Sequence, residues 1–267
     1  MRAALGWLLR GGLLGGLAFL IFGPLANLAL WAVAIQWYFP HKLPLTWGFK
    51  YWAEVFKPTS DTVAALGTSV LIACITVVVC LLMAVPGGYA LGRLRLPGRS
   101  LILLLLLLPQ AFPSLAAYFN LARLFYLVGL NGTIAGVVLV HASHGLVIAV
   151  WIAAAAFAAI DPELELAARN IGASALRTAL TVTLPLAMPG VTASAIFVFL
   201  ESLDEFTGTY FVGVPDVTTL PLAMFTASLA GNYQIAAITA LVLLVPSVGF
   251  MLVVERFLKA EMLAKIG

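Results

Sequence analysis

The chain alternates between long apolar runs and short polar segments. A membrane-spanning helix needs about 20 mostly apolar residues to cross about 30 Å of hydrocarbon. On this measure the sequence predicts six spans, at residues 11–37, 63–91, 101–126, 134–158, 184–206 and 235–255. Runs such as LILLLLLLP lack the two-residue alternation of barrel strands, and backbone groups in lipid must bond within their own segment. We therefore predict an all-α polytopic membrane protein with six transmembrane helices, forming one domain over residues 1–267.

The composition supports this class. Of the 267 residues, 63% are hydrophobic and only 9% are charged, whereas soluble domains are about a quarter charged. The net charge of +3 does not indicate nucleic-acid binding, because the basic residues lie at the ends of apolar runs. Cys74 and Cys80 point to different faces of one predicted helix, so we interpret them as buried small side chains without a disulfide.

The N-terminus has some features of a signal peptide. Arg2 and Arg10 precede an apolar run that extends from Leu13 to about Trp37. This run is too long for the apolar core of a signal peptide, and no clear cleavage site follows it. We interpret it as a retained first span.

The basic residues predict the orientation of the spans. With the N-terminus inside, the inner segments carry Arg2, Arg10, Arg93, Arg95, Arg99, Arg169, Arg177, Arg256, Lys259 and Lys265. The outer segments carry only Lys42, Lys50, Lys57 and Arg123. Because basic residues concentrate in short cytoplasmic segments, we predict that both termini are cytoplasmic.

The outer segment 38–61 is rich in aromatic residues, namely Tyr38, Phe39, Trp47, Phe49, Tyr51, Trp52 and Phe56. Tyrosine and tryptophan favour the headgroup zone, which predicts an interfacial helix near residues 47–56. Contact with an extracytoplasmic partner is a second, compatible interpretation.

Prolines interrupt several predicted spans. Pro86 is expected to weaken the inner end of the second span, Pro109 and Pro113 to break the third, and Pro246 to interrupt the sixth. Kinked helices of this kind either line a pathway or serve packing, and both interpretations stay open.

A patterned polar segment separates the fourth and fifth spans. Asp161 and Pro162 form a strong helix start, and Gly172 is a natural helix stop. Ser174 can begin a second helix that reaches Leu184 and Pro185. The sequence thus predicts a helix–Gly–helix elbow over residues 162–183, which is either a simple connector or a short helix that inserts into a groove on a soluble partner.

This elbow resembles the signature loop of binding-protein-dependent ABC import permeases of the MetI-like superfamily. The family pattern is Glu-Ala-Ala, three residues, Gly, nine residues, Ile, one residue and Leu-Pro; this chain has Leu166-Ala167-Ala168, Gly172, Val182 and Leu184-Pro185. The resemblance implies a cytoplasmic coupling helix that docks into a cleft of an ATPase. The implied coupling residues are Glu163, Glu165, Leu166, Ala167, Ala168, Arg169, Gly172, Ala173 and Ser174. Leu166 stands at the position where the family usually has glutamate. Glu163 or Glu165 beside it could supply the missing charge.

The resemblance covers about residues 60–255. LGTSVLIA at 66–73 is similar to the family's opening of the second span. ESLDEFTGTYFVG and TTLPLAMF, within 201–225, are similar to the spermidine/putrescine-type branch. This similarity implies a bacterial inner-membrane permease whose solute is a polyamine or a related small cation.

The chain has no Gly-x4-Gly-Lys-Ser/Thr motif, so ATP and Mg²⁺ are expected to bind a separate ATPase subunit and no cofactor is expected here. The family resemblance further implies a second permease subunit, which we expect to be a paralogue, because six helices make half of the pathway. A solute-binding protein is expected to approach the outer segments 38–61 and 207–232.

Five residues are candidates for the solute pathway. Glu201, Asp204 and Glu205 lie at the outer end of the fifth span, where ionised groups usually face a cavity or partner. Tyr118 and Asn120 lie in the broken third span. Simple solvation of the carboxylates at the helix end is the competing interpretation.

Two other functions stay open. The three carboxylates could drive a stand-alone proton-coupled secondary transporter. His141 and His144, on one helical face, could begin a metal site in a membrane enzyme. Interfacial or packing histidines are the favoured interpretation, because no third ligand is near in the sequence. No common hydrolase or metalloprotease motif occurs, so we expect no enzymatic activity.

Overall fold

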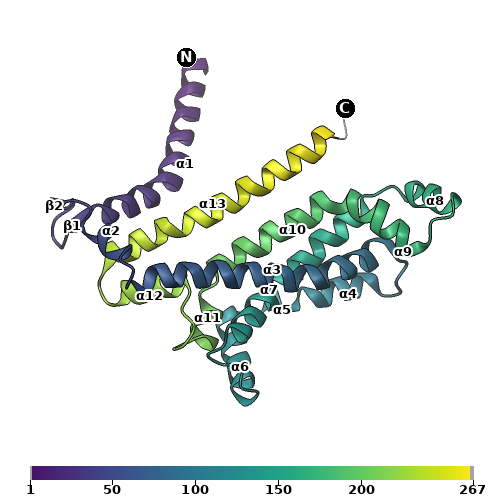
Figure 1. Cartoon of the computed structure of the whole chain (residues 1–267). Helices are drawn as coiled ribbons and strands as arrows, with labels where there is room; N and C mark the ends of the chain where they lie inside the picture. The colour runs from purple at the N-terminus through teal and green to yellow at the C-terminus, as the bar shows by residue number, and fades with distance from the viewer. Residues whose placement is uncertain (1, 265–267) are drawn as a thin grey trace. The chain divides into compact units, whose positions relative to one another are not determined.

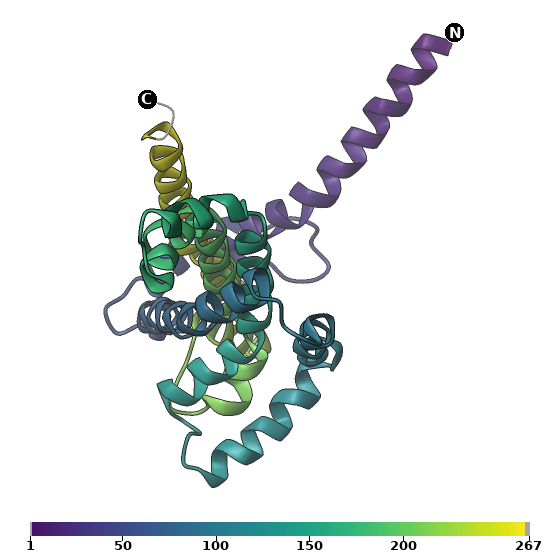
Figure 2. The same ribbon diagram turned by 90° about the vertical axis from the view of Figure 1, so that its right-hand side faces the viewer.

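The computed structural model describes residues 2–264, and the chain divides into two compact units. Unit 1 comprises the chain up to Ala64 together with Ala223–Leu244, and unit 2 comprises Ala65–Leu222 together with the chain from Val245 on. Figures 1 and 2 show the elements of each unit. Lys265, one of the predicted inner cations, lies outside the described residues, and Arg2 and Lys259 are described by their backbone alone.

Five helices in the described part of the chain are long and apolar enough to cross a membrane. They are Arg10–Ala32 within α1 (Arg2–Ala32), α3 (Asp61–Arg93), α7 (Ile134–Ala158), the segment Ala175–Asp204, and Tyr233–Val253 within α13 (Tyr233–Ala264). The segment Ala175–Asp204 consists of α9 (Ala175–Thr178), the π-helical turn η1 (Ala179–Thr183) and α10 (Leu184–Asp204). Five of the six predicted spans therefore correspond to long helices.

The third predicted span, residues 101–126, is not one long helix. The chain forms α4 (Arg99–Leu106), α5 (Leu108–Ala111) and α6 (Ser114–Leu127). Pro109 lies in the first turn of α5, and Pro113 lies directly before α6. Because proline lacks an amide proton and favours a first helical turn, each of these prolines marks a helix start, as the predicted break requires.

Pro86 and Pro246 do not interrupt their helices. α3 continues through Pro86 as far as Arg93, and α13 continues through Pro246. The interruption predicted at Pro246 is therefore wrong, whereas the weakening predicted at Pro86 stays a prediction. A helix that crosses lipid has no water for its freed backbone groups, so the remaining helical bonds keep the chain regular on both sides of the proline.

Unit 2 is built around α7 and α10, which lie side by side in Figures 1 and 2. The C-terminal half of α3 packs against α7 through small residues. A Cβ added at Gly92 would lie 2.6 Å from the carbonyl oxygen of Ala154 and 2.8 Å from the Cβ of Phe157. Glycine therefore lets the two backbones approach closely at this crossing. The buried side chains around the crossing are Cys80, Ala84, Leu91, Ala149, Val150, Ala153, Ala154 and Phe157.

Short helices follow α10. α11 (Thr207–Val212) packs against α6 and α7 within unit 2, and α12 (Leu220–Leu229) leads on to α13. The hydroxyl oxygen of Ser69 in α3 accepts a hydrogen bond from the backbone amide of Leu220 at 2.7 Å, which ties the start of α12 to α3.

Unit 1 contains a small antiparallel sheet that the all-α prediction missed. β1 (Ala34–Gln36) pairs with β2 (Thr46–Trp47), and α2 (Lys50–Val55) follows. Residues 33–37 continue the apolar run of α1, so hydropathy alone did not separate them from the span. The indole of Trp52 donates to the carbonyl oxygen of Ala32 at 2.8 Å, where α1 ends. A helix is thus present near residues 47–56, but shorter than predicted, and its location at the membrane interface stays a prediction.

Candidate functional site

The elbow at residues 162–183, called the hairpin below, begins with a strong helix cap. The side chain of Asp161 accepts a hydrogen bond from the amide of Glu163 at 2.9 Å, and Pro162 occupies the first turn of α8 (Pro162–Asn170). The acidic residues Glu163 and Glu165 lie in that first turn, where the helix dipole favours negative charge. The predicted helix start is confirmed.

The turn of the hairpin depends on glycine. Gly172 has a φ of +92°, and its amide donates to the carbonyl of Arg169 at 2.9 Å. No atom lies within 4 Å of a Cβ added there, so the backbone conformation rather than space requires glycine. Ser174 then caps α9 by accepting from the amide of Arg177 at 3.3 Å. The predicted helix stop and second start are both confirmed.

α8 contacts the rest of unit 2 along one narrow face. None of its residues is fully buried, and only Glu165 and Ala168, three positions apart on one face, are half-buried. Among the other predicted coupling residues, Ala173 is half-buried, whereas Glu163, Leu166, Ala167, Arg169, Gly172 and Ser174 are exposed. Figure 1 shows α8 and α9 at one end of the α7–α10 pair.

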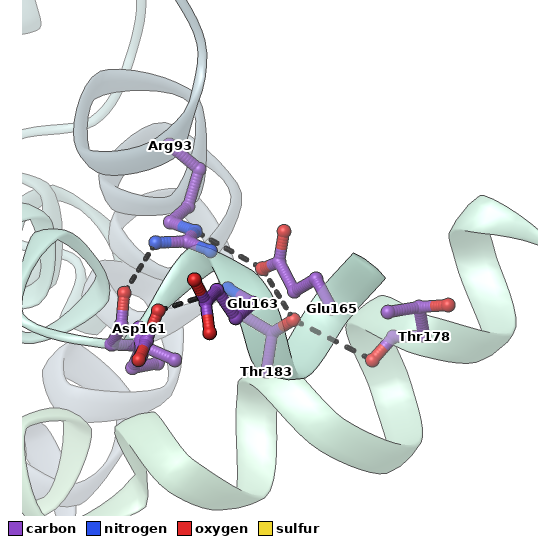
Figure 3. Close-up of polar contacts among 7 residues, drawn as sticks. Arg93, Asp161, Glu163, Glu165, Thr178 and Thr183 are labelled. Atoms are coloured by element: carbon purple, nitrogen blue, oxygen red, sulfur yellow. Dashed lines mark hydrogen bonds and ion pairs between the residues drawn. The ribbon is translucent and has the colours of Figure 1, made fainter. Parts of the chain in front are cut away.

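Figure 3 shows how the inner face of α8 is held. One oxygen of Glu165, Oε1, accepts from Nε of Arg93 at 3.0 Å and from the hydroxyl of Thr183 at 2.7 Å. Nη1 of Arg93 also donates to the carbonyl oxygen of Ile160 at 2.6 Å. Arg93 is the last residue of α3, and Thr183 is the last residue of η1. A single carboxylate therefore joins α8 to the ends of two other elements.

Sequence analysis missed Arg93 and Thr183 as members of this site. Arg93 counted only as one of the inner basic residues, and Thr183 only as a residue before the fifth span. The sequence contained one signal for this contact. Arg93 ends the second predicted span and Glu165 follows the fourth, so both charges are expected near the same membrane face. A single sequence does not specify which carboxylate the arginine contacts.

The pKa of Glu165 lies below its ordinary value. Partial burial of the carboxyl raises this pKa, but the hydrogen bonds from Arg93 and Thr183, with the positive charges of Arg93 and Arg169, outweigh burial. The side chains of Arg93 and Glu165 are only 8% and 13% exposed. Glu165 is therefore an ionised, shielded partner of Arg93 at neutral pH.

The solvent-exposed surface of the hairpin carries large apolar side chains. Leu166 is 56% exposed, Ile171 89% and Leu176 70%. Leu166 occupies the position where the family pattern has glutamate, and it points away from the Arg93–Glu165 pair. Glu165 faces inward and does not replace that glutamate on the exposed face, whereas Glu163 is exposed.

The carboxylates at the end of α10 have unequal surroundings. Glu205 accepts from the hydroxyl of Tyr118 at 3.2 Å and from the amide of Gly208 at 2.7 Å, so it ties the first turn of α11 to α6. Asp204 is exposed, and Oε2 of Glu201 is buried without a hydrogen-bond partner in the described chain. A role in the solute pathway stays a prediction for all three carboxylates.

The other two pathway candidates are engaged in local structure. Tyr118 is 1% exposed and belongs to the apolar core around α6, α7 and α11. The side-chain amide of Asn120 donates to the carbonyl of Ala116, one turn earlier in α6, at 2.8 Å. Neither contact tests a role in transport, which stays a prediction for both residues.

The two histidines serve packing. Both ring nitrogens of His141 are hydrogen-bonded, Nδ1 to the hydroxyl of Ser202 at 2.8 Å and Nε2 to that of Thr209 at 2.9 Å. The ring of His144 lies 5.2 Å from that of Tyr118. Within the described residues no group of three or more His, Cys, Asp or Glu side chains could hold a metal ion. The metal-site alternative therefore has no support from the geometry.

Unit 1 contains a pocket of about 450 Å³. Charged side chains from the end of α2 to the start of α3 line one side of it, including Glu54, Lys57 and Asp61. Thr226 and Ala227 of α12 line the other side. This pocket lies in the segments that were predicted to face an extracytoplasmic partner.

Comparisons with known proteins fit a membrane protein with an exposed helical hairpin between two spans. Residues 84–260 match the family described as binding-protein-dependent transport system inner membrane component. A probable molybdenum ABC transporter permease protein of Haloferax volcanii is 32% identical, over 74% of this chain and 76% of its own length. The trehalose transport system permease protein SugB of Mycobacterium tuberculosis is 28% identical, over 80% of each chain.

Among solved structures, one chain of a bacterial ABC transporter involved in the import of the acidic polysaccharide alginate has a similar fold. The TM-score is 0.70 with 18% sequence identity, and the match covers 96% of this chain and 98% of that one. The similarity in structure thus extends over almost the whole chain, although the identity is low.

The fold and the hairpin define a multi-pass helical transport protein of the membrane. The chain belongs to the family of binding-protein-dependent transport system inner membrane components, and it is a permease subunit of an ABC importer. Permease subunits are not enzymes themselves, so the expectation that this chain has no enzymatic activity is confirmed.

Proposed function

We propose that this chain forms half of the solute pathway of an ATP-driven importer and is coupled to a separate ATPase through the hairpin at residues 162–183. The observation that carries the proposal is the hairpin itself: a capped helix, an obligatory positive-φ glycine and an exposed outer face, attached by one narrow polar face. An exposed, oriented helix of this kind suits docking into a groove of a soluble partner.

The proposal includes the remaining partners. ATP and Mg²⁺ bind the ATPase subunits rather than this chain, and a second permease subunit, in our view a paralogue, completes the pathway. One solved alginate transporter is described in complex with an alginate-bound periplasmic protein. We assign the corresponding contact here to the outer segments 38–61 and 207–232, and the pocket beside Glu54, Lys57 and Asp61 supports this assignment.

The orientation follows from the same assignment. The hairpin must lie on the cytoplasmic side to reach an ATPase, which places both termini inside, in agreement with the distribution of basic residues. In this arrangement Arg93, Arg169 and Arg177 lie on the cytoplasmic side.

A cationic solute such as a polyamine is supported only by the carboxylates near the end of α10, of which Glu205 is already occupied by local hydrogen bonds. The relatives cited above are named for molybdenum and trehalose, and they do not support a polyamine. The affinity of the partner solute-binding protein is the appropriate measurement for identifying the cargo. A proton-coupled secondary transporter is not favoured, because the family is defined by dependence on a binding protein.

Replacement of Gly172 tests the coupling role. Valine at a φ of +92° is expected to be strained by at least about 1–2 kcal/mol, whereas asparagine tolerates positive φ better. We expect Gly172→Val to deform the hairpin and to lose the ATPase on co-purification. Gly172→Asn, the matched control, is expected to retain it. Full ATPase stoichiometry in the purified valine variant would refute the docking role of the hairpin.

A further inference from the structure

α8, the first helix of the hairpin, is held by few contacts, although the proposed function requires it to transmit movement. α8 has no fully buried residue, and only Glu165 and Ala168 are half-buried against the rest of unit 2. An alanine methyl group buries little area, so apolar packing contributes little to the orientation of this helix. The polar contacts of Glu165 therefore dominate the attachment of α8.

Those contacts converge on one point. Oε1 of Glu165 accepts from Arg93 at 3.0 Å and from Thr183 at 2.7 Å. Arg93 also holds the carbonyl of Ile160, one residue before the cap of α8, at 2.6 Å. The guanidinium thus restrains both the entry to α8 and its middle, by donating through two different nitrogens (Figure 3). Lysine, with a single ammonium, is poorly suited to both contacts at this geometry.

The low solvent exposure of Arg93 and Glu165 strengthens their ion pair. With Arg93 8% exposed and Glu165 13% exposed, the ion pair is screened by salt much less than a surface pair. Hydrogen bonds between ionised groups are also stronger than neutral ones. Removing either charge leaves the other shielded and uncompensated, which is more disruptive than losing an exposed pair.

The third contact involves an irregular part of the chain. Thr183 ends the π-helical turn η1, and α10 begins at the next residue. π-helical turns occur often at functional positions. The Thr183 hydroxyl also lies 3.5 Å from the carbonyl of Thr178, a longer distance than to Glu165. The start of α10 is therefore linked to α8 through the side chain, in addition to the connection along the backbone.

We propose that Arg93, Glu165 and Thr183 form a clamp that makes α8 move as one body with the ends of α3 and α10. The clamp residues are positioning residues: they carry displacement of the docked helix to two spans at once. This inference rests on the proposed coupling function. Without the clamp, α8 stays docked on the ATPase but moves independently of α3.

Distances between two spin labels, measured by double electron–electron resonance on the assembled complex, test the clamp. Spin labels at Asn170→Cys, an exposed position of α8 outside the predicted coupling residues, and at Met83→Cys, an exposed position of α3, report on the α8–α3 distance in a Cys74→Ala/Cys80→Ala background. With the clamp intact, we expect one narrow distance distribution that is unchanged by ATP and vanadate. In Glu165→Ala and Arg93→Ala we expect a broader distribution that shifts with nucleotide, with the ATPase still bound.

Conservative variants distinguish loss of the clamp from misfolding. Thr183→Val and Glu165→Gln keep the shape of the site and are expected to give intermediate broadening. Arg95→Ala removes an exposed cation just after α3, outside both the clamp and the hairpin, and is expected to resemble the parent. Unchanged distributions in the Glu165 and Arg93 variants, with the ATPase bound, would overturn the clamp. Loss of the ATPase from the parent complex would instead contradict the proposed coupling function.

Discussion

At the residue scale, the adjacent positions 165 and 166 have opposite environments. Glu165 faces inward and pairs with Arg93, while Leu166 is 56% exposed on the surface that the proposal assigns to the ATPase. Neighbouring residues on a helix differ by about 100° in direction, so they cannot exchange these roles. The absence of the family's glutamate at 166 therefore leaves the internal attachment of α8 intact and makes that part of the docking surface apolar.

The pKa of Glu165 gives a prediction about pH. Because this pKa is lowered in the folded protein, the stabilisation it provides is fully present above the unfolded value of about 4.3 and is lost as the pH falls through the folded pKa. The charged groups that face it, Arg93 of α3 and Arg169 of α8, do not titrate in this range. We therefore expect the mobility of a spin label at Glu163→Cys to stay constant between pH 7 and about pH 5, and to rise only at lower pH.

The Glu165→Gln variant is the control for this titration. Its label is expected to be more mobile at pH 7 and to lack the acid-dependent change. A rise in mobility between pH 7 and 5 in the parent would contradict a lowered pKa for Glu165.

At the element scale, hydropathy predicted the long helices well and the breaks less well. α3, α7 and α10 follow from apolar runs that are long enough to span a membrane. Proline had two different outcomes: a helix start at Pro109 and Pro113, and a continuous helix at Pro86 and Pro246. Which outcome occurs depends on whether neighbouring elements leave room for a turn, and that information is not local in sequence.

The hairpin was predictable because its signals are local. Asp161, Pro162, Gly172 and Ser174 each specify a cap or a turn by their own chemistry. The contact of Glu165 with Arg93 was not predictable, since these residues lie 72 positions apart and meet only after α3 and α7 have packed. The β1–β2 sheet was missed for another reason: its first strand continues an apolar run.

The α3–α7 crossing provides an element-scale prediction. A leucine at Gly92 must displace backbone atoms of α7, including the carbonyl oxygen of Ala154. Overpacking of this kind typically costs about 1–3 kcal/mol, so we expect Gly92→Leu to lower the midpoint of thermal unfolding in detergent. Gly87→Ala is the matched control, because an added Cβ there meets only Val150 at 4.0 Å. Equal unfolding temperatures for the two variants would show that the close approach is absent.

At the scale of the whole molecule, sequence and comparisons establish a permease subunit of an ABC importer. The relatives are named for chemically different cargoes, and the carboxylates near the end of α10 have unequal surroundings. Transport specificity is therefore best sought in the binding protein, and mechanical coupling in the hairpin.

Site-directed photo-crosslinking tests the central claim most directly. A photoreactive amino acid at Ile171, which is 89% exposed on the hairpin, is expected to form a covalent adduct with the ATPase subunit in the purified, ATP-hydrolysing complex. The same probe at Phe39, which is 95% exposed in the outer segment, is expected to give no such adduct. An active complex in which the Ile171 probe never reaches the ATPase, or in which the Phe39 probe does, would contradict this account of the coupling.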